Sequence, residues 1–96
     1  MVVDFDCRLD ARTGVLTLTG VLDADTTAAL ARLEVRGVGI RMIDARRVEL
    51  LAAAGVTALL EIVDRRPTPV QASAAARRTI ECCGVADTLV ISPVRG

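Results

Sequence analysis

The stretch VELLAAAGVTALL, residues 48–60, decides how this chain is expected to fold. A β-like apolar run ends in Ala52–Gly55, and from Val56 to Val63 apolar residues recur at spacings of three and four, as on one face of a helix. A strand leading into a helix is the repeating junction of α/β proteins, and ligands commonly bind at such junctions. Here the junction carries only methyl groups and no reactive side chain. Any indication of function must therefore come from the sequence around it.

Upstream of this junction, two strands and a helix are predicted. Apolar and charged residues alternate from Val3 to Leu9, and alternation returns in VLTLTGVL, residues 15–22, after a turn at 12–14. A helix opens at residues 23–27, where either aspartate can cap it. Leu30 and Leu33 form its apolar stripe, which fades through residues 34–36 into the glycines at 37 and 39.

Downstream, helices and strands alternate. A strand is predicted at IRMID, residues 40–44, followed by a short link through residues 46–48. The helix of the central junction should run from about residue 53 to 64, before Pro67 and Pro69. The remaining predicted elements are a strand at 69–73, a helix at 74–83, a strand at 88–92 and a loose tail at 93–96. We therefore expect a small single α/β domain over residues 1–96, with a mixed sheet of about five strands, three or more helices, and the later strands parallel through right-handed crossovers.

Composition excludes several classes of function. The 96 residues carry 12 basic and 12 acidic side chains, so no net field draws the chain to nucleic acid. Phe5 is the sole aromatic residue, which leaves no platform for stacked bases. The N-terminus does not resemble a signal peptide, and no apolar run approaches the ~18 residues of a membrane span. With three cysteines and no disulfide framework, we expect a protein of the reducing cytoplasm.

Catalytic and ligand-binding motifs are scarce. The chain has no histidine, which removes the commonest general base and every Ser-His-Asp or Cys-His arrangement. The glycines of GVG, residues 37–39, precede a predicted strand and are no phosphate loop. Asp23, Asp25 and Asp44 could cluster at one end of the sheet, although capping and solvation explain the first two better. We expect no enzyme activity, no cofactor and no metal site.

The cysteines and the arginine pairs have alternative interpretations. Cys82-Cys83 could be a redox pair, but adjacent cysteines bridge only through a strained ring. We expect three free thiols, with Cys7 on the apolar face of its strand and at least one of the adjacent pair buried. The pairs at 46–47, 65–66 and 77–78 could form a basic face, but solvated pairs are the simpler interpretation.

Three long segments, taken in order, resemble the STAS family, the domains related to bacterial anti-sigma factor antagonists. They are GVLTLTGVLDADTTAAL (14–30), IRMIDARRVELLAAAGVTALLEIV (40–63) and PTPVQASAAARRTIECCGVADTLVIS (67–92). The resemblance runs nearly end to end and rests on the ordered set rather than on one motif. The segment between the first helix and the third strand is shorter than is usual in the family, which bears on the length of that helix.

The resemblance also implies what the alanines replace. In the family, the turn into the second helix typically reads Asp-Ser-Ser/Ala-Gly, and a partner kinase phosphorylates the first serine. Aligned on Gly55, the aspartate falls on Ala52, that serine on Ala53 and the next residue on Ala54. A phosphate adds a charge of roughly −1.5 to −2 at pH 7, which would expel a complementary partner. Alanine has no hydroxyl, so the switch is missing.

Three interpretations of the alanines stay open. Their small side chains can allow the helix to approach the sheet closely, with Gly55 relieving the turn. The domain can also be fixed in its unphosphorylated form and bind a partner constitutively, which is compatible with the first interpretation. The third moves the phosphate acceptor to Thr57, one turn along the same helical face, where its hydroxyl can bond to the preceding turn.

The resemblance therefore implies a non-enzymatic, cytoplasmic protein-binding module and non-phosphorylatable regulator of transcription, with an anti-sigma factor or a sensor kinase as partner. The expected docking residues are Asp23, Asp25, Thr26, Ala53, Ala54, Val56 and Thr57. One alternative is the STAS subunit of a membrane lipid-transport ABC complex, where the same face binds an ATPase. Another is nucleotide binding by the domain itself, which no phosphate loop supports.

Overall fold

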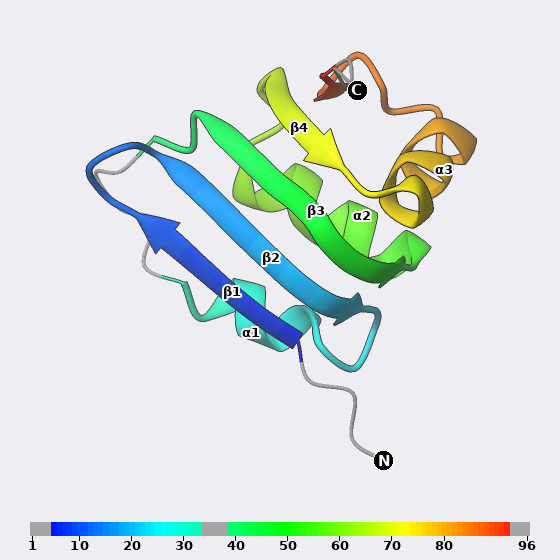
Figure 1. Cartoon of the computed structure of the whole chain (residues 1–96), viewed down its shortest axis with the longest axis horizontal. Helices are drawn as coiled ribbons and strands as arrows, with labels where there is room; N and C mark the ends of the chain where they lie inside the picture. The colour runs from blue at the N-terminus through cyan, green and yellow to red at the C-terminus, as the bar shows by residue number, and fades with distance from the viewer. Residues whose placement is uncertain (1–4, 34–38, 93–96) are drawn as a thin grey trace.

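A mixed β-sheet with helices against it makes up this computed structural model, which describes residues 5–33 and 39–92 (Figure 1). Within these residues the elements are β1 (Phe5–Asp10), β2 (Val15–Leu22), α1 (Thr27–Ala31), β3 (Met42–Leu51), α2 (Ala53–Ile62), β4 (Thr68–Ala72), α3 (Ala74–Cys82) and β5 (Leu89–Ile91). The five strands lie in the order β1-β2-β3-β4-β5; β1 and β2 are antiparallel, and every later pair is parallel. The predicted α/β class and mixed sheet are confirmed.

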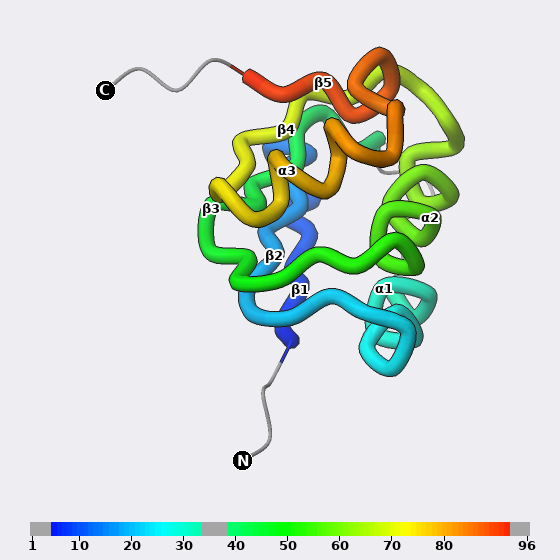
Figure 2. Tube along the Cα trace, turned by 90° about the vertical axis from the view of Figure 1, so that its right-hand side faces the viewer, coloured from blue at the N-terminus to red at the C-terminus, as the bar shows by residue number. Residues whose placement is uncertain are grey.

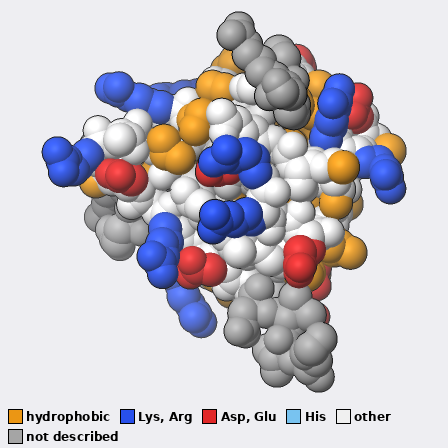
Figure 3. Space-filling model, in the orientation of Figure 1, with side chains coloured by type: hydrophobic (Ala, Val, Ile, Leu, Met, Phe, Trp, Pro, Cys, Tyr) orange, Lys and Arg blue, Asp and Glu red, His pale blue; other side chains and the backbone are white. Residues whose placement is uncertain are grey.

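The core lies on one face of the sheet. Figure 2 shows α1 and α2 on the same side of the strands, and α3 packs mainly against β3. Alternation in β1 and β2 points one set of side chains toward these helices and the other toward solvent. The core is aliphatic, as the composition requires, and its largest fully buried hydrophobic side chains are Leu16, Leu18, Leu22, Ile43, Leu59, Ile80, Leu89 and Val70. The opposite face carries polar side chains, with basic groups over its centre (Figure 3).

The third strand is longer than predicted. The register between β2 and β3 shifts twice, and at each shift β3 has one residue more than β2, which is a β-bulge. The bulges expose two adjacent residues at a time, Arg46-Arg47 and then Glu49-Leu50, while Val48 and Leu51 stay in the core. Two neighbours exposed together break the two-residue alternation, which is why the prediction of a link at residues 46–48 is wrong.

The helix ends also differ from the predictions. α2 ends at Ile62, and the chain then takes the left-handed conformation at Asp64 and Arg65 (φ 54° and 53°), so the helix stops before the prolines. α1 spans only Thr27–Ala31, with Leu30 in the core. The predicted fading of this helix at 34–36, the glycine at 37 and the loose tail at 93–96 lie outside the described residues.

Candidate functional site

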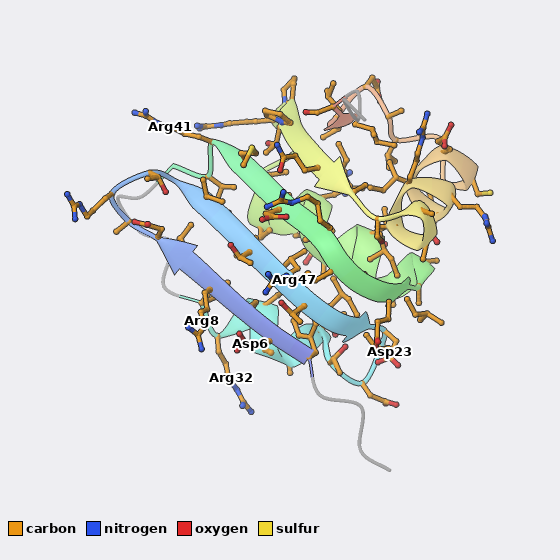
Figure 4. The ribbon with its side chains drawn as sticks, in the orientation of Figure 1. Asp6, Arg8, Asp23, Arg32, Arg41 and Arg47 are labelled. Carbon is orange, nitrogen blue, oxygen red and sulfur yellow. The ribbon has the colours of Figure 1, made fainter. Side chains whose placement is uncertain are left out.

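The turn after β2 is held by its own side chains. The Asp23 carboxylate accepts hydrogen bonds from the backbone N–H groups of Asp25 (2.9 Å) and Thr26 (3.2 Å). The Thr26 hydroxyl donates to the carbonyl of Val21 (2.9 Å) and accepts from the N–H of Asp23 (2.9 Å). Asp23 therefore fixes the turn that precedes α1, whereas Asp25 is exposed. Figure 4 shows Asp23 at this end of the sheet.

The start of α2 lies directly beside this turn. Leu22 pairs with Leu51 at the ends of two parallel strands, and the N–H of Ala52 donates to the carbonyl of Leu22 (2.9 Å). Ala52 precedes α2 in an extended conformation and offers no side-chain cap. Because the carboxyl ends of parallel strands meet at one edge, the β2–α1 turn and the first turn of α2 form one continuous surface.

Gly55, rather than the alanines, meets the sheet closely. A Cβ atom built at Gly55 would lie 2.7 Å from the carbonyl oxygen of Leu22, closer than real Cβ atoms come. Ala53 and Ala54 are both exposed, so their methyl groups do not fill the space between helix and sheet. The close approach that was predicted for the alanines is therefore made by Gly55. Gly55 lies within α2 without a positive φ, so the predicted role of this glycine in relieving the turn is wrong.

The expected docking residues divide into exposed and internal ones. Val56 is only 2% exposed and belongs to the core, so its side chain is not available to a partner, which corrects the prediction. The hydroxyl of Thr26 is used within the turn. Thr57 is exposed, and its hydroxyl donates to the carbonyl of Ala53 (3.3 Å) in the preceding turn. The accessible set is thus Asp23, Asp25, Ala53, Ala54 and Thr57, with Thr26 as support.

A groove between α1 and α2 extends this surface. It has a volume of about 510 Å³, and Ala54 and Thr57 line it together with further residues of both helices. Most of its walls are small or apolar, while Glu61 contributes a carboxylate. None of the sequence motifs predicts this groove. The signal that could have found it is the clustering of alanines at helical spacing in both segments, which keeps the space between the two helices open.

Asp44 lies apart from the other two aspartates. It pairs with Thr17 near the beginning of β3, whereas Asp23 follows the end of β2, so the predicted carboxylate cluster does not form. Instead, the Arg46 guanidinium donates to both carboxylate oxygens of Asp44, each at 3.0 Å. This bidentate hydrogen bond lowers the pKa of Asp44. Within the described residues, no group of acidic or cysteine side chains is arranged to hold a metal ion.

Replacing Arg46 with glutamine is expected to raise the pKa of Asp44 toward its ordinary value. A carboxyl whose pKa is lowered by folding stabilises the native state above its unfolded pKa, and that contribution is lost as the pH falls through the folded pKa. The wild type should therefore lose more stability on acidification below about pH 4 than Arg46→Gln does. NMR titration of the Asp44 carboxyl carbon measures the shift directly. Arg47→Gln is the control, because Arg47 acts on Asp44 only through its charge, and an equal shift in both variants would contradict the role of the hydrogen bond.

The predicted burial of one of the two adjacent cysteines is wrong. Cys82 and Cys83 are both exposed at the end of α3, although at least one was expected to be buried. Cys7 lies in β1 and is half-buried, and its thiol donates to the carbonyl of Ala29 in α1 (3.7 Å). Burial raises the pKa of Cys7, and the Asp6 carboxylate raises it further. All three thiols are free, as predicted.

In each pair of adjacent arginines, one arginine forms an ion pair with a nearby carboxylate. Arg66 lies 3.9 Å from Asp64, and Arg77 lies 3.3 Å from Glu81 one helical turn away. In these pairs every side chain is at least half exposed, so each contributes little to stability. The three arginine pairs come from β3, from the segment after α2, and from α3.

The similarity of this chain to known proteins is found in its fold and not in its sequence. No family model and no curated protein matches the sequence. Among solved structures, the chain is similar to an anti-sigma factor antagonist from Mycobacterium paratuberculosis, with a TM-score of 0.69 over 97% of this chain and 87% of that chain. The chain has the STAS fold. At 20% sequence identity the likeness extends to the fold alone.

The STAS fold accounts for the order of the elements around the candidate site. In residues 5–33 and 39–92, the mixed five-stranded sheet with three helices agrees with the architecture that the sequence resemblance predicted. The helices in the described part of the chain are all too short or too polar to cross a membrane.

Proposed function

We propose that this chain is a STAS-fold protein-binding module without catalytic activity. Its docking surface is formed by the β2–α1 turn and the first turn of α2, and consists of Asp23, Asp25, Thr26, Ala53, Ala54 and Thr57. The observation that carries this proposal is the hydrogen bond between Ala52 and Leu22, which joins the two segments. The turn is rigidly hydrogen-bonded beside two exposed alanines, so a partner meets a preformed surface.

The partner that fits this surface is an anti-sigma factor or a sensor kinase. Similarity to a bacterial anti-sigma factor antagonist supports this class. The charges of the surface restrict the class of partner further. Asp23 and Asp25 supply carboxylates at the turn, and Glu61 adds one at the neighbouring groove. A partner with basic side chains around an apolar centre would complement this arrangement.

The docking surface is proposed to be constitutive. Residues 50–56 contain no hydroxyl, so a kinase has nothing to phosphorylate where the family carries its serine. Thr57 follows within α2, and its hydroxyl already donates to the preceding turn. Binding would then be controlled by the amount of this protein or by the state of its partner, and not by phosphate on the turn.

Incubation with ATP and the cognate kinase is expected to leave the docking surface unmodified. The reason is the missing hydroxyl at Ala53 and the helical position of Thr57. Phosphopeptide mapping by mass spectrometry measures the outcome, with a serine-bearing antagonist of the same kinase as the positive control. Phosphate on Thr57 would contradict constitutive binding and would support the relocated acceptor.

Affinity capture from the source organism tests the class of partner. The proposal expects an anti-sigma factor or a sensor kinase to be retained, and the purified partner should then bind the isolated chain directly. Retention of a transporter ATPase instead would favour the lipid-transport alternative. Saturable binding of a nucleotide to the isolated chain would favour the nucleotide-binding alternative.

A further inference from the structure

The end of α3 exposes two adjacent thiols beside a groove that the proposed function does not use. Cys82 lines this groove, which has a volume of about 490 Å³. The other lining residues are Ala72, Ala74, Arg77, Arg78 and Glu81. Cys83 is exposed as well but is not part of the lining. A groove of this size has room for a small molecule, and its thiol is accessible to one.

The charges of this groove favour an anionic ligand. Arg77 is engaged with Glu81 (3.3 Å), so these two charges partly cancel. Arg78 forms no ion pair with any residue in 5–33 or 39–92. It lies one helical turn before Cys82, where residues share a face of the helix. A guanidinium in this position can bind a carboxylate through two parallel hydrogen bonds.

We propose that Cys82 is a site of S-thiolation by anionic low-molecular-weight disulfides, with Arg78 binding a carboxylate of the incoming disulfide. In this reaction the Cys82 thiolate attacks one sulfur of the disulfide R–S–S–R. A new bond forms between the Cys82 Sγ and that sulfur, and the original S–S bond breaks. The second half leaves as the thiolate RS⁻, which takes up the proton that Cys82 lost. Cys82 is oxidised and the leaving half is reduced, so no further oxidant is needed.

The neighbouring thiol does not reverse this reaction within α3. Consecutive Cα atoms lie about 3.8 Å apart, whereas unstrained disulfides join Cα atoms roughly 4.4–6.8 Å apart. Cys83 has helical backbone angles (φ −79°, ψ −8°), so closing a bond to Cys82 would distort the helix end. The mixed disulfide on Cys82 is therefore the stable product. Cys7 does not compete, because it is half-buried and its side chain lies against α1.

The test uses the folded wild-type chain with oxidised glutathione, which carries carboxylates, and with 2-hydroxyethyl disulfide, which is neutral. Intact-mass spectrometry follows the rate, and peptide mapping assigns the cysteine. We expect one glutathione adduct, on Cys82, and none at this rate in Cys82→Ser. Arg78→Gln should slow the reaction with oxidised glutathione about threefold and leave the neutral reagent unchanged, a size typical of exposed charge pairs. Arg12→Gln removes the same charge from the exposed β1–β2 turn and should change neither rate.

Several outcomes would overturn the proposal. They are faster modification of Cys83 than of Cys82, no reaction of either thiol, and equal effects of Arg78→Gln on both reagents. Loss of two hydrogens with a Cys82–Cys83 bond in place of an adduct would show that the pair closes on itself. Circular dichroism of each variant verifies that the rates compare folded proteins.

Discussion

Gly55→Ala is expected to lower the free energy of unfolding by about 1–3 kcal/mol, the usual cost of overpacking a core. The added methyl group would lie 2.7 Å from the carbonyl oxygen of Leu22, 2.8 Å from the Leu22 Cγ and 2.9 Å from the Leu51 Cδ1. The first of these atoms is backbone and accepts the hydrogen bond from Ala52, so α2 cannot move away without weakening that bond. Alanine favours a helix over glycine by up to about 1 kcal/mol, which offsets only part of the strain.

Urea denaturation of wild type and variant measures this difference, with an unchanged m-value indicating that the unfolded state is the same. Gly39→Ala is the matched control. A methyl group built at Gly39 meets no atom within 4 Å, so its effect should stay within about 0.5 kcal/mol. If Gly55→Ala is as stable as the wild type, then α2 does not sit as closely on β2 as the structure indicates.

Ala53→Asp is expected to weaken partner binding at least about tenfold without lowering the melting temperature, since an unpaired charge in an interface commonly costs 2–5 kcal/mol. Ala53 is exposed and is the first residue of α2. A carboxylate there benefits from the helix dipole by about 0.3–1 kcal/mol, so the fold should tolerate it. The new charge would also lie with Asp23 and Asp25 on the proposed docking surface, and it would imitate in part a phosphate at this position.

The control for this variant is Ala74→Asp. Ala74 is also exposed and is the first residue of its helix, α3, so the charge and its effect on the helix are matched and only the location differs. Isothermal titration of both variants with the captured partner gives the two affinities, and differential scanning calorimetry gives the melting temperatures. If Ala74→Asp loses binding while Ala53→Asp keeps it, the partner binds near the start of α3 and the proposed location of the docking surface is wrong.

The elements of the site were predictable because their signals are local. Alternating apolar and polar residues predict β1 and β2, and apolar residues at spacings of three and four predict α2. Each of these patterns is complete within a few residues of sequence. Parallel strands bring the turn at Asp23 and the start of α2 together at one edge, and this too follows from the order of the elements. The sequence even contained the signal against Val56 as a docking residue, because Val56 belongs to the same apolar stripe as Leu59.

Other features depend on distances between elements and could not be read from any one segment. The two bulges of β3 arise only in its pairing with β2, and they turn Arg46 and Arg47 toward the same face. Cys82 and Cys83 are both exposed because of the side of α3 that packs against the core. The sequence alone thus determined the order and type of the elements, since periodicity is a property of a short window. Register, close approach at Gly55 and exposure were decided by tertiary packing, because each is set by atoms far away along the chain.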